Sequence, residues 1–431
     1  MLKNILKNTL VFILVFLAKI VLRKYKPKII AVAGSVGKTS TKEAIYTIIK
    51  SAHFAWRSPK SYNSELGIPL AILGLKNAGK NPFAWMLNIL NGLELITFNI
   101  PYPKYLVLEA GADRPGDIKK IVSWLKPDIS VITMFGQTPA HIEFFKDREE
   151  LIDEDGKVVE MLKPDGLLIL NQDDADSMSQ RAKTKARALT CGFNEKATMS
   201  VSNSQIMYDE TGTPLGMTYK ISYEGNSVPV RILGALGNSS VYASLPALLV
   251  GKELGINLLS GIDALLKHQP PPGRLRIIPG LKNTVIVDDT YNSSPVAAEE
   301  ALRAFNDLRV SGKKIVVLGD MLELGRNSEG AHKEIGKLSA GVCDILVTVG
   351  IRARGIAEGA LIAGLSEKNV FQFEDAYEAG KFVEGVMEKG DAILVKGSQS
   401  MRMERIVEEI MSEPDKKELL LVRQDREWQG K

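Results

Sequence analysis

The chain has 431 residues, of which 45% are hydrophobic and 25% are charged. This length is more than one hydrophobic core usually organises, so two or three globular domains are expected. The formal net charge is only +4, which excludes a nucleic-acid-binding surface spread over the whole molecule. The two cysteines, Cys191 and Cys343, lie far apart without CxxC spacing. This spacing argues against a disulfide framework or a zinc site and makes a reducing cytoplasm the default location.

The N-terminal stretch MLKNILKNTLVFILVFLAKIVLRKYKPK joins an apolar run to basic flanks. The unbroken run, Leu10 to Ala18, is shorter than the ~20 apolar residues that span a bilayer, and it reaches Leu22 only if Lys19 extends to the head groups. Basic flanks are typical of a helix attracted to anionic lipid. They consist of Lys3, Lys7, Arg23, Lys24, Lys26 and Lys28. We expect residues 1–27 to form a membrane-associating or linker helix, attached to the inner face of the cell membrane through residues 1–25. A helix packed on the protein's own surface is the alternative.

From Lys28 onward, short apolar runs alternate with helical patterns. The runs are KIIAVAG, YLVLEAG, ISVITMFG, GLLILN, TVIVDDTYN, KKIVVLGD, DILVTVG and AILVKGS. Such runs, each followed by a polar turn, indicate parallel sheets covered by helices and an α/β fold class. Residues 196–236 alternate polar and apolar side chains, which predicts an antiparallel β excursion at the edge of the first sheet. The run QPPPGR, Gln269 to Arg274, predicts a stiff linker between domains 28–272 and 273–431.

A glycine-containing loop follows the first of these runs and opens a helical pattern. Its residues are Gly34, Ser35, Val36, Gly37, Lys38, Thr39 and Ser40. Glycines let backbone amides turn inward, and a helix N-terminus adds a positive dipole, so this loop is suited to bind phosphate. Lys38 is placed to reach the β- and γ-phosphates and Thr39 to bind Mg²⁺. The earlier glycine lies only three residues before Gly37, unlike the common GxxxxGK[ST] spacing. The loop predicts that the chain binds ATP.

Two later residues are candidate metal ligands. Glu109 closes the run YLVLEAG, and a carboxylate at the carboxyl end of a strand beside a phosphate loop suits Mg²⁺ on the γ-phosphate. His141 follows another strand in MFGQTPAHIEFF, where we favour a second metal site over a purely structural histidine.

Several segments, in order along residues 28–410, resemble the Mur ligase family, the ATP-dependent amide ligases of peptidoglycan assembly. They are GSVGKTSTKE, YNSELGIPLAIL, LVLEAGADRPGDI, the His141 segment, PPGRLRII, VDDTYNSSP, VLGDMLELG and VKGSQSMRME. VDDTYNSSP and GDMLELG resemble the D-alanyl-D-alanine-adding branch. The resemblance implies a central P-loop ATPase domain with a mostly parallel sheet and a C-terminal Rossmann-like domain that brings the amine.

The resemblance also implies a chemistry and a set of site residues. A peptide carboxylate attacks the γ-phosphate of ATP, and an amine such as D-alanyl-D-alanine then displaces phosphate, as in an ADP-forming acid–amino-acid ligase. Lys38 and Thr39 would hold phosphate and Mg²⁺, Glu109 the first Mg²⁺, and His141 the second. Arg274 is suited to a phosphate contact. The residues expected to meet the nucleotide from the C-terminal domain are Asp289, Tyr291 and Asn292. Weaker candidates for the amine side are Asp320, Glu323, Lys396, Gly397 and Ser398, for which strand ends and helix caps are an equal alternative.

The chain departs from the family in three respects. Fewer than thirty residues precede the ATPase strand, so the UDP-sugar domain has no counterpart, and a separate protein or the membrane would then hold the sugar. Only Asn63 remains of three asparagines expected in the substrate stretch, and Ser239, Ser240 and Ala243 replace the polar segment near adenine.

The third departure concerns the family's carbamoylated lysine, which falls on Asp155. This residue offers a shorter carboxylate to the second Mg²⁺, with an ordinary low pKa. The alternative is a surface charge in a degraded site. Lys157, two residues on, would point elsewhere on a helix.

Three functions are therefore open. The first is the amide ligase just described, and the second is a related membrane-anchored ligase such as a polyglutamate synthase. The third is an ATP-binding scaffold without catalysis. No nucleic-acid partner is expected.

Overall fold

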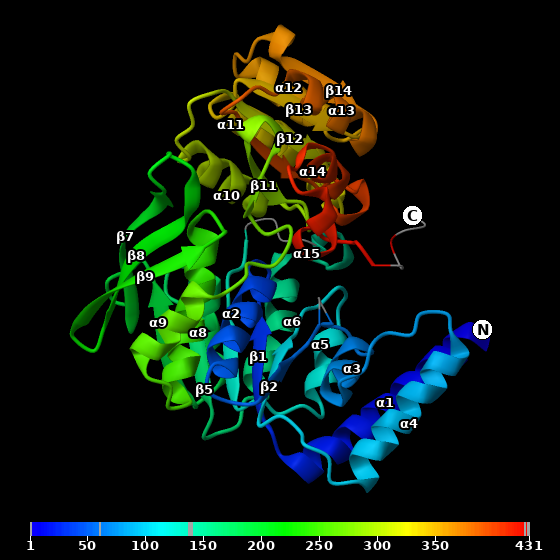
Figure 1. The fold of residues 1–431 in the computed structure, drawn as a ribbon. Coiled ribbons are helices and arrows are strands. Elements are labelled where there is room, and N and C mark those ends of the chain that lie inside the picture. Colours follow the sequence, from blue (N-terminus) through cyan, green and yellow to red (C-terminus); the bar gives the residue numbers. More distant parts are fainter. Residues whose placement is uncertain (1, 60–61, 137–140, 426–427, 429–431) are drawn as a thin grey trace.

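A computed structural model of the chain describes residues 2–59, 62–136, 141–425 and 428. Each half of the chain forms one β-sheet with helices on both of its faces (Figure 1). The expected α/β class is confirmed, and all eight apolar runs identified in the sequence form strands.

The first sheet is parallel over most of its width and ends in an antiparallel extension. Its spatial order is β2 (Ala55–Arg57), β3 (Tyr105–Glu109), β1 (Lys28–Ala33), β4 (Ile129–Ile132), β5 (Leu167–Asn171), β6 (Arg187–Gly192), β7 (Met199–Tyr208), β8 (Pro214–Tyr223) and β9 (Asn226–Leu233). Strands β7, β8 and β9 pair antiparallel, with Met199 opposite Tyr223. The predicted β excursion at the edge of the first sheet is confirmed.

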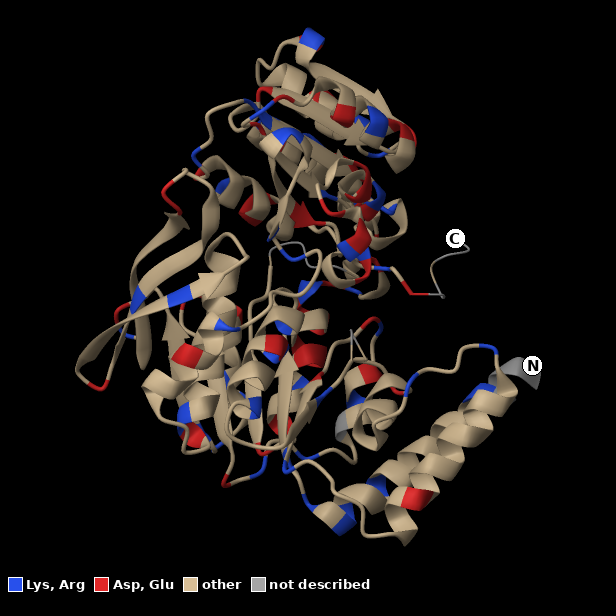
Figure 2. Ribbon diagram, viewed as in Figure 1, with Lys and Arg blue, Asp and Glu red and all other residues tan. Residues whose placement is uncertain are grey.

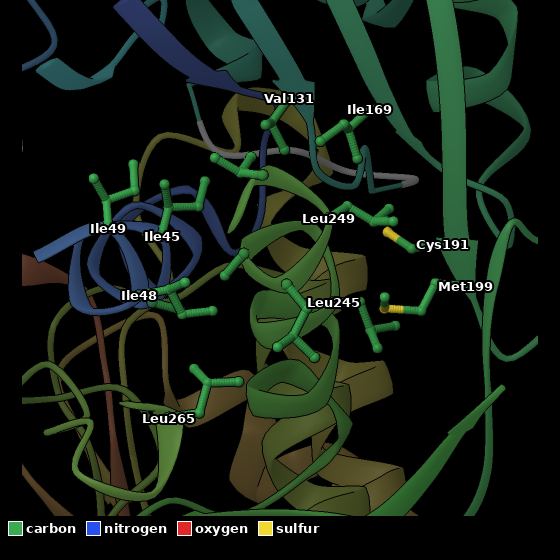
Figure 3. Close-up of a cluster of buried hydrophobic side chains, with 14 of the residues drawn as sticks. Ile45, Ile48, Ile49, Val131, Ile169, Cys191, Met199, Leu245, Leu249 and Leu265 are labelled. Atoms are coloured by element: carbon green, nitrogen blue, oxygen red, sulfur yellow. The ribbon is translucent and has the colours of Figure 1, made fainter. Parts of the chain in front are cut away.

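The first sheet is buried because alternate side chains of its strands meet helices on opposite faces. Ile30 and Val32 of β1 face α2 (Lys38–Lys50), α8 (Asn238–Glu253) and α9 (Leu258–Leu266). Figure 3 shows this core, where isoleucines of α2 lie opposite leucines of α8. The labelled side chains are Ile45, Ile48, Ile49, Val131, Ile169, Cys191, Met199, Leu245, Leu249 and Leu265. The buried α2 holds the phosphate loop at its N-terminus in place.

The opposite face of the first sheet carries the remaining helices of this half. Ala31 and Ala33 of β1 face α6 (Arg148–Glu160) and the start of α5 (Asp117–Val122). Helix α7 (Ala175–Ser179) follows β5.

The second sheet is parallel except for its first strand. Its order is β10 (Arg276–Pro279), β11 (Val285–Asp289), β15 (Ala392–Lys396), β12 (Lys314–Gly319), β13 (Ile345–Val349) and β14 (Val370–Phe373). One face packs on α10 (Pro295–Asn306), α11 (Ser328–Ala340) and α12 (Arg354–Ile362). The other packs on α13 (Ala376–Val386) and α14 (Glu404–Ile410), and α15 (Lys417–Leu420) follows near the C-terminus. This arrangement agrees with the expected Rossmann-like half, while the domain boundary at residue 272 stays a prediction.

The N-terminal helix α1 (Leu2–Tyr25) is packed into the fold. Its Leu14, Leu17, Ala18 and Val21 are buried in a cluster shared with α3 (Gly67–Leu73) and β3. Helix α4 (Pro82–Thr97), which the sequence did not predict, lies along α1 (Figure 1). Packing on the protein's own surface, the alternative for residues 1–27, is therefore what the structure shows. No helix in the described part of the chain combines the length and apolar character needed to cross a membrane.

Replacement of Leu17 by alanine is expected to lower the free energy of unfolding by about 3 kcal/mol, because a buried leucine truncation loses transfer energy and leaves a cavity. Leu17 is only 3% exposed and lies against Gly92 of α4. Phe12→Ala is the matched control on the same helix, since Phe12 is 72% exposed. Urea unfolding of both variants measures the difference, and equal midpoints would show that α1 contributes no packing energy.

Candidate active site

The phosphate loop has the geometry that the sequence predicts. Gly34 and Gly37 take positive φ angles of 120° and 87°, which side chains with a Cβ rarely adopt. The backbone amides of Ser35 and Val36 donate to the Met134 carbonyl at 2.8 and 3.0 Å and so fix the loop to the end of β4. Helix α2 begins at Lys38, directly after the loop. The strand, loop and helix are therefore arranged as an anion site.

Thr39 and Glu109 meet at the end of the loop. The Thr39 hydroxyl lies 3.2 and 3.1 Å from the two carboxylate oxygens of Glu109. Lys42, which no sequence motif singled out, is fully buried, with Nζ 3.4 Å from Glu109 and 2.9 Å from the Ser58 carbonyl. Its position four residues after Lys38 on one helix face was the available signal. Lys42 balances the buried carboxylate and holds it towards Thr39.

Asp155 lies inside the site. It is 3% exposed on α6 and accepts a hydrogen bond from the Ala112 amide at 3.3 Å. The alternative that Asp155 is a surface charge is therefore wrong. The expectation of a low pKa is also wrong, because burial raises the pKa of Asp155 to about 7 although the Lys38 charge opposes this shift. Lys157 points away from this site and pairs with Glu154.

His141 connects the two halves of the molecule. Its Nδ1 lies 2.6 Å from the carboxylate of Glu323, and its Nε2 lies 3.7 Å from Asp113. Both His141 and Glu323 adopt positive φ angles, 68° and 62°, which cost non-glycine residues conformational energy. Between His141 and Asp155, both in the described residues, no hydrogen bond or ion pair is found, so their joint role at a second metal stays a prediction.

Residues of both halves line one cleft of about 630 Å³. From the first half it takes Lys38, Thr39, Asn63, Glu109, His141 and Asp155, and from the second half Arg274, Tyr291, Asn292 and Glu323. Asn63, the retained asparagine, lies near Gly111 and the Lys38 side chain. The structure thus brings most of the predicted site residues together.

Arg274 reaches from the linker to the phosphate loop. Its Nη2 lies 3.5 Å from the Thr39 hydroxyl, and its guanidinium stacks 4.1 Å from the centre of the Tyr291 ring. The preceding Gly273 has φ of +68°, and a Cβ there would lie 2.7 Å from the Tyr291 amide. Glycine at this position therefore allows the linker to pass close to Tyr291 and aim Arg274 at the loop.

Other predicted residues of the second half lie outside the lining of this cleft, although Asp289 and Lys396 line a smaller cavity together with Gly37 and Arg274. Lys396 is buried and forms an ion pair with Asp289 at 2.6 Å, and it also donates to the Asn292 carbonyl at 2.9 Å. Asp320 accepts from the Ala353 amide at 2.7 Å, and the Ser398 hydroxyl accepts from the Leu322 amide at 2.8 Å. The contacts of Asp320 and Ser398 match the alternative of strand ends and caps. A Cβ at Gly397 would lie 2.6 Å from Met403, so this glycine also serves packing.

The chain's own polar atoms fit a nucleotide at this loop. Among the described residues, the buried Ser35 hydroxyl and the buried Arg274 Nε have no hydrogen-bond partner, and buried polar atoms normally have one. A second cavity of about 240 Å³ starts at Val36 and Gly37 and continues to Ser239 and Ala243. Phosphate oxygens at the loop would satisfy both orphaned atoms, and the second cavity offers room beyond them.

The protein oxygens at the end of the phosphate loop can bind one Mg²⁺ if nucleotide phosphates and waters supply the remaining ligands. Within the described residues, no group of three His, Cys, Asp or Glu side chains could hold a metal ion. Thr39 and Glu109 offer two oxygen ligands, and Mg²⁺ commonly takes one or two carboxylates together with waters and substrate phosphates. Thr39 and Glu109 would thus hold the ion.

Replacement of Glu109 by glutamine is expected to raise the Mg²⁺ concentration needed for half-maximal phosphate release by roughly tenfold or more, since an amide binds a hard cation less well than a carboxylate. Glu160→Gln, on the exposed end of α6, is the control. Glu109→Gln also removes the charge partner of the buried Lys42. Thermal melts without Mg²⁺ therefore test whether a loss of stability, and not of a metal ligand, explains the weaker Mg²⁺ response. An unchanged Mg²⁺ titration would remove Glu109 from the metal site.

Comparisons with known proteins agree with this geometry. Residues 88–251 match the Mur ligase middle domain, and residues 273–399 match the Mur ligase, glutamate ligase domain. The chain is 28% identical over 399 residues to UDP-N-acetylmuramoyl-tripeptide–D-alanyl-D-alanine ligase of Bacillus subtilis, covering 92% of this chain and 79% of that protein. The corresponding ligase of Escherichia coli is 25% identical over 393 residues, with 91% and 78% covered. The crystal structure of the MurF ligase of Thermotoga maritima in complex with ADP superposes with a TM-score of 0.76 at 26% identity, covering 94% and 84%. The chain belongs to the Mur ligase family, with MurF ligases among its relatives.

Proposed function

We propose that the chain is an ATP-dependent, ADP-forming amide ligase of the MurF type, which joins a peptide carboxylate to D-alanyl-D-alanine in peptidoglycan precursor synthesis. The observation that carries this proposal is the cleft in which Lys38, Thr39 and Glu109 of one half face Arg274 and Tyr291 of the other. A ligase that joins two substrates needs such a cleft, because both reacting groups must be held beside one phosphate. The names of the similar ligases support the same activity.

The reaction proceeds in two steps. An oxygen of the peptide carboxylate attacks the γ-phosphorus of ATP, and the bond from this phosphorus to the β-phosphate oxygen breaks. ADP departs, and the peptide carries an acyl phosphate. The amine then attacks the acyl carbon, and phosphate leaves from the tetrahedral intermediate as the amine loses a proton. Both steps spread negative charge over phosphate oxygens.

The chain's residues position these groups and neutralise their charge. Lys38 and Arg274 supply positive charge to the transferred phosphoryl group, and backbone amides at the start of α2 donate hydrogen bonds to its oxygens. Mg²⁺, held by Thr39 and Glu109, would neutralise further charge on the nucleotide phosphates. Asn63 of the first half and Asn292 of the second half line the cleft, where their amide groups would contact the two substrates.

Phosphate release from ATP tests the proposal. The purified chain is incubated with a UDP-linked muramoyl tripeptide and D-alanyl-D-alanine, with glutamate in place of the dipeptide, or with neither amine. Mass spectrometry identifies the joined product. Release with the dipeptide supports the MurF-type ligase, whereas release with glutamate alone would support a polyglutamate-type ligase. No release with any pair would support a scaffold.

Three further properties are predicted from the sequence alone. The first is a cytoplasmic location, which the use of ATP as co-substrate favours. The second is recognition of the sugar by a separate protein, and the third is attachment to the inner face of the membrane through residues 1–25. The structure bears on the last of these through the exposed sides of α1 and α4.

A further inference from the structure

Helix α4 exposes an apolar stripe along its whole length. Its outward side chains follow helical spacing and are 43–76% exposed. They are Phe83, Met86, Leu87, Leu90, Leu93 and, just after the helix, Phe98. The opposite side of α4, with Gly92 and Leu95, is buried against the protein. Large apolar side chains gathered on one exposed face mark an interaction site rather than ordinary surface.

Helix α1 runs beside α4 in the same direction and adds to this surface. Leu17 lies against Gly92, and further along Lys24 Nζ donates to the carbonyls of Leu95 and Ile96 at 3.0 and 3.1 Å. This register places Phe12 and Phe16, which are 72% and 56% exposed, level with the stripe along the helix axes. We call the outer side of α4 together with Phe12 and Phe16 the α1–α4 surface. It holds eight of the twenty exposed large apolar side chains in the described part of the chain.

Basic residues surround this surface. Residues 1–28 and 74–104 contain ten of the 55 basic residues of the chain and only one of its 51 acidic residues, Glu94. These two segments therefore carry a formal charge of +9, while the rest of the chain carries −5. Most of these basic residues lie towards the two ends of the helix pair (Figure 2), while Lys19 lies within α1. At one end lie Lys7, Lys76 and Lys80, and at the other Arg23, Lys24, Lys26 and Lys104.

We propose that the α1–α4 surface binds the face of an anionic lipid bilayer, with the two helices lying in the plane of the membrane. Apolar side chains would enter the boundary between head groups and acyl chains, and the basic ends would meet lipid phosphates. This assignment moves the lipid contact from the central leucines of α1, which are buried, to the outer side of α4 and the exposed Phe12 and Phe16 of α1. It does not rest on the ligase activity, since binding needs neither ATP nor substrate.

Charge favours a lipid surface over a second copy of the chain. A symmetric dimer through this surface would bring two segments of charge +9 together, and like charges across an interface oppose association. Anionic lipid neutralises the same charge.

Binding to vesicles tests the proposal with the full chain in the absence of nucleotide. Co-sedimentation is measured with vesicles of phosphatidylcholine alone and of phosphatidylcholine mixed with phosphatidylglycerol. We expect binding to the mixed vesicles that weakens as salt is raised. Leu87→Ser combined with Leu90→Ser is expected to lower the partition coefficient at least about tenfold, because two side chains no longer enter the apolar layer. Lys76→Gln with Lys80→Gln should weaken binding only to the anionic vesicles.

The matched control is Ile351→Ser with Ile362→Ser, which removes two side chains of 73% and 66% exposure beside α12, far from α4 (Figure 1). This control should bind as the unmodified chain does, and melting curves should show that every variant is folded. Equal binding of the Leu87/Leu90 variant would overturn the proposal, as would equal binding of the unmodified chain to neutral vesicles or none to either. Sedimentation velocity measures the oligomeric state of the unmodified chain and of the Leu87/Leu90 variant. A dimer that forms only with the unmodified chain would show that this surface is a contact between copies, and would overturn the proposal.

Discussion

Replacement of Lys38 by alanine is expected to reduce phosphate release at least roughly 10³-fold while the chain stays folded. In the structure the Lys38 Nζ donates to the carbonyls of Gly34 and Ser35 at 2.5 and 3.3 Å, at the mouth of the cleft. Its charge therefore lies where the transferred phosphoryl group would be held. Loss of this charge removes stabilisation of the transition state rather than packing, because Lys38 belongs to no apolar cluster.

The measurement is phosphate release under saturating ATP, together with a thermal melt. Lys50→Ala is the matched control, since Lys50 is an exposed lysine at the other end of the same helix. Both variants should melt within a few degrees of the unmodified chain. Near-normal turnover of the Lys38 variant would show that the loop does not hold the reacting phosphate.

The sequence predicted the part of the fold that local patterns dictate. Buried parallel strands read as continuous β-branched runs, so β1, β3, β4 and β5 were found in the sequence. The phosphate loop was also predictable, because a glycine turn followed by Lys38 and Thr39 has only one common use. The carboxyl ends of parallel strands meet at one edge of a sheet, and this rule placed Glu109 beside that loop correctly.

What the sequence did not predict depends on contacts between distant segments. Helix α4 has an apolar outer face, so its pattern does not show which side packs on α1. The ion pair between Lys396 and Asp289 joins residues 107 positions apart, and no local spacing reports it. The resemblance placed Asp155 in the site, but its burial and raised pKa were not predicted, because they depend on the contact with Ala112 and on the walls of the cleft.

Burial of Asp155 makes stability depend on pH near neutrality. Its pKa is about 7 in the folded chain and about 3.9 in an unfolded chain. The folded state therefore binds the proton more tightly, and the free energy of unfolding should fall as pH rises from 4 to 8, by roughly 4 kcal/mol from this group alone. Asp155→Asn should remove this slope in Mg²⁺-free urea unfolding. Asp153→Asn, two residues away and exposed, should leave this slope unchanged. Hydrogen bonding to Lys183 holds the pKa of Asp153 below its ordinary value, so Asp153 is already ionised in this pH range.

Asp155→Asn is also expected to lower turnover at least roughly 10²-fold, because the site loses a buried carboxylate. Mg²⁺ binding near Asp155 would require loss of its proton, so the Mg²⁺ affinity of the unmodified chain should rise as pH passes through 7. Turnover should not depend on added bicarbonate, since Asp155 carries its carboxyl group without modification. Bicarbonate-dependent turnover would point instead to a carbamoylated lysine, with Lys157 as the first to examine. Wild-type turnover of Asp155→Asn at both pH 6 and pH 8 would show that this buried carboxyl serves the fold alone.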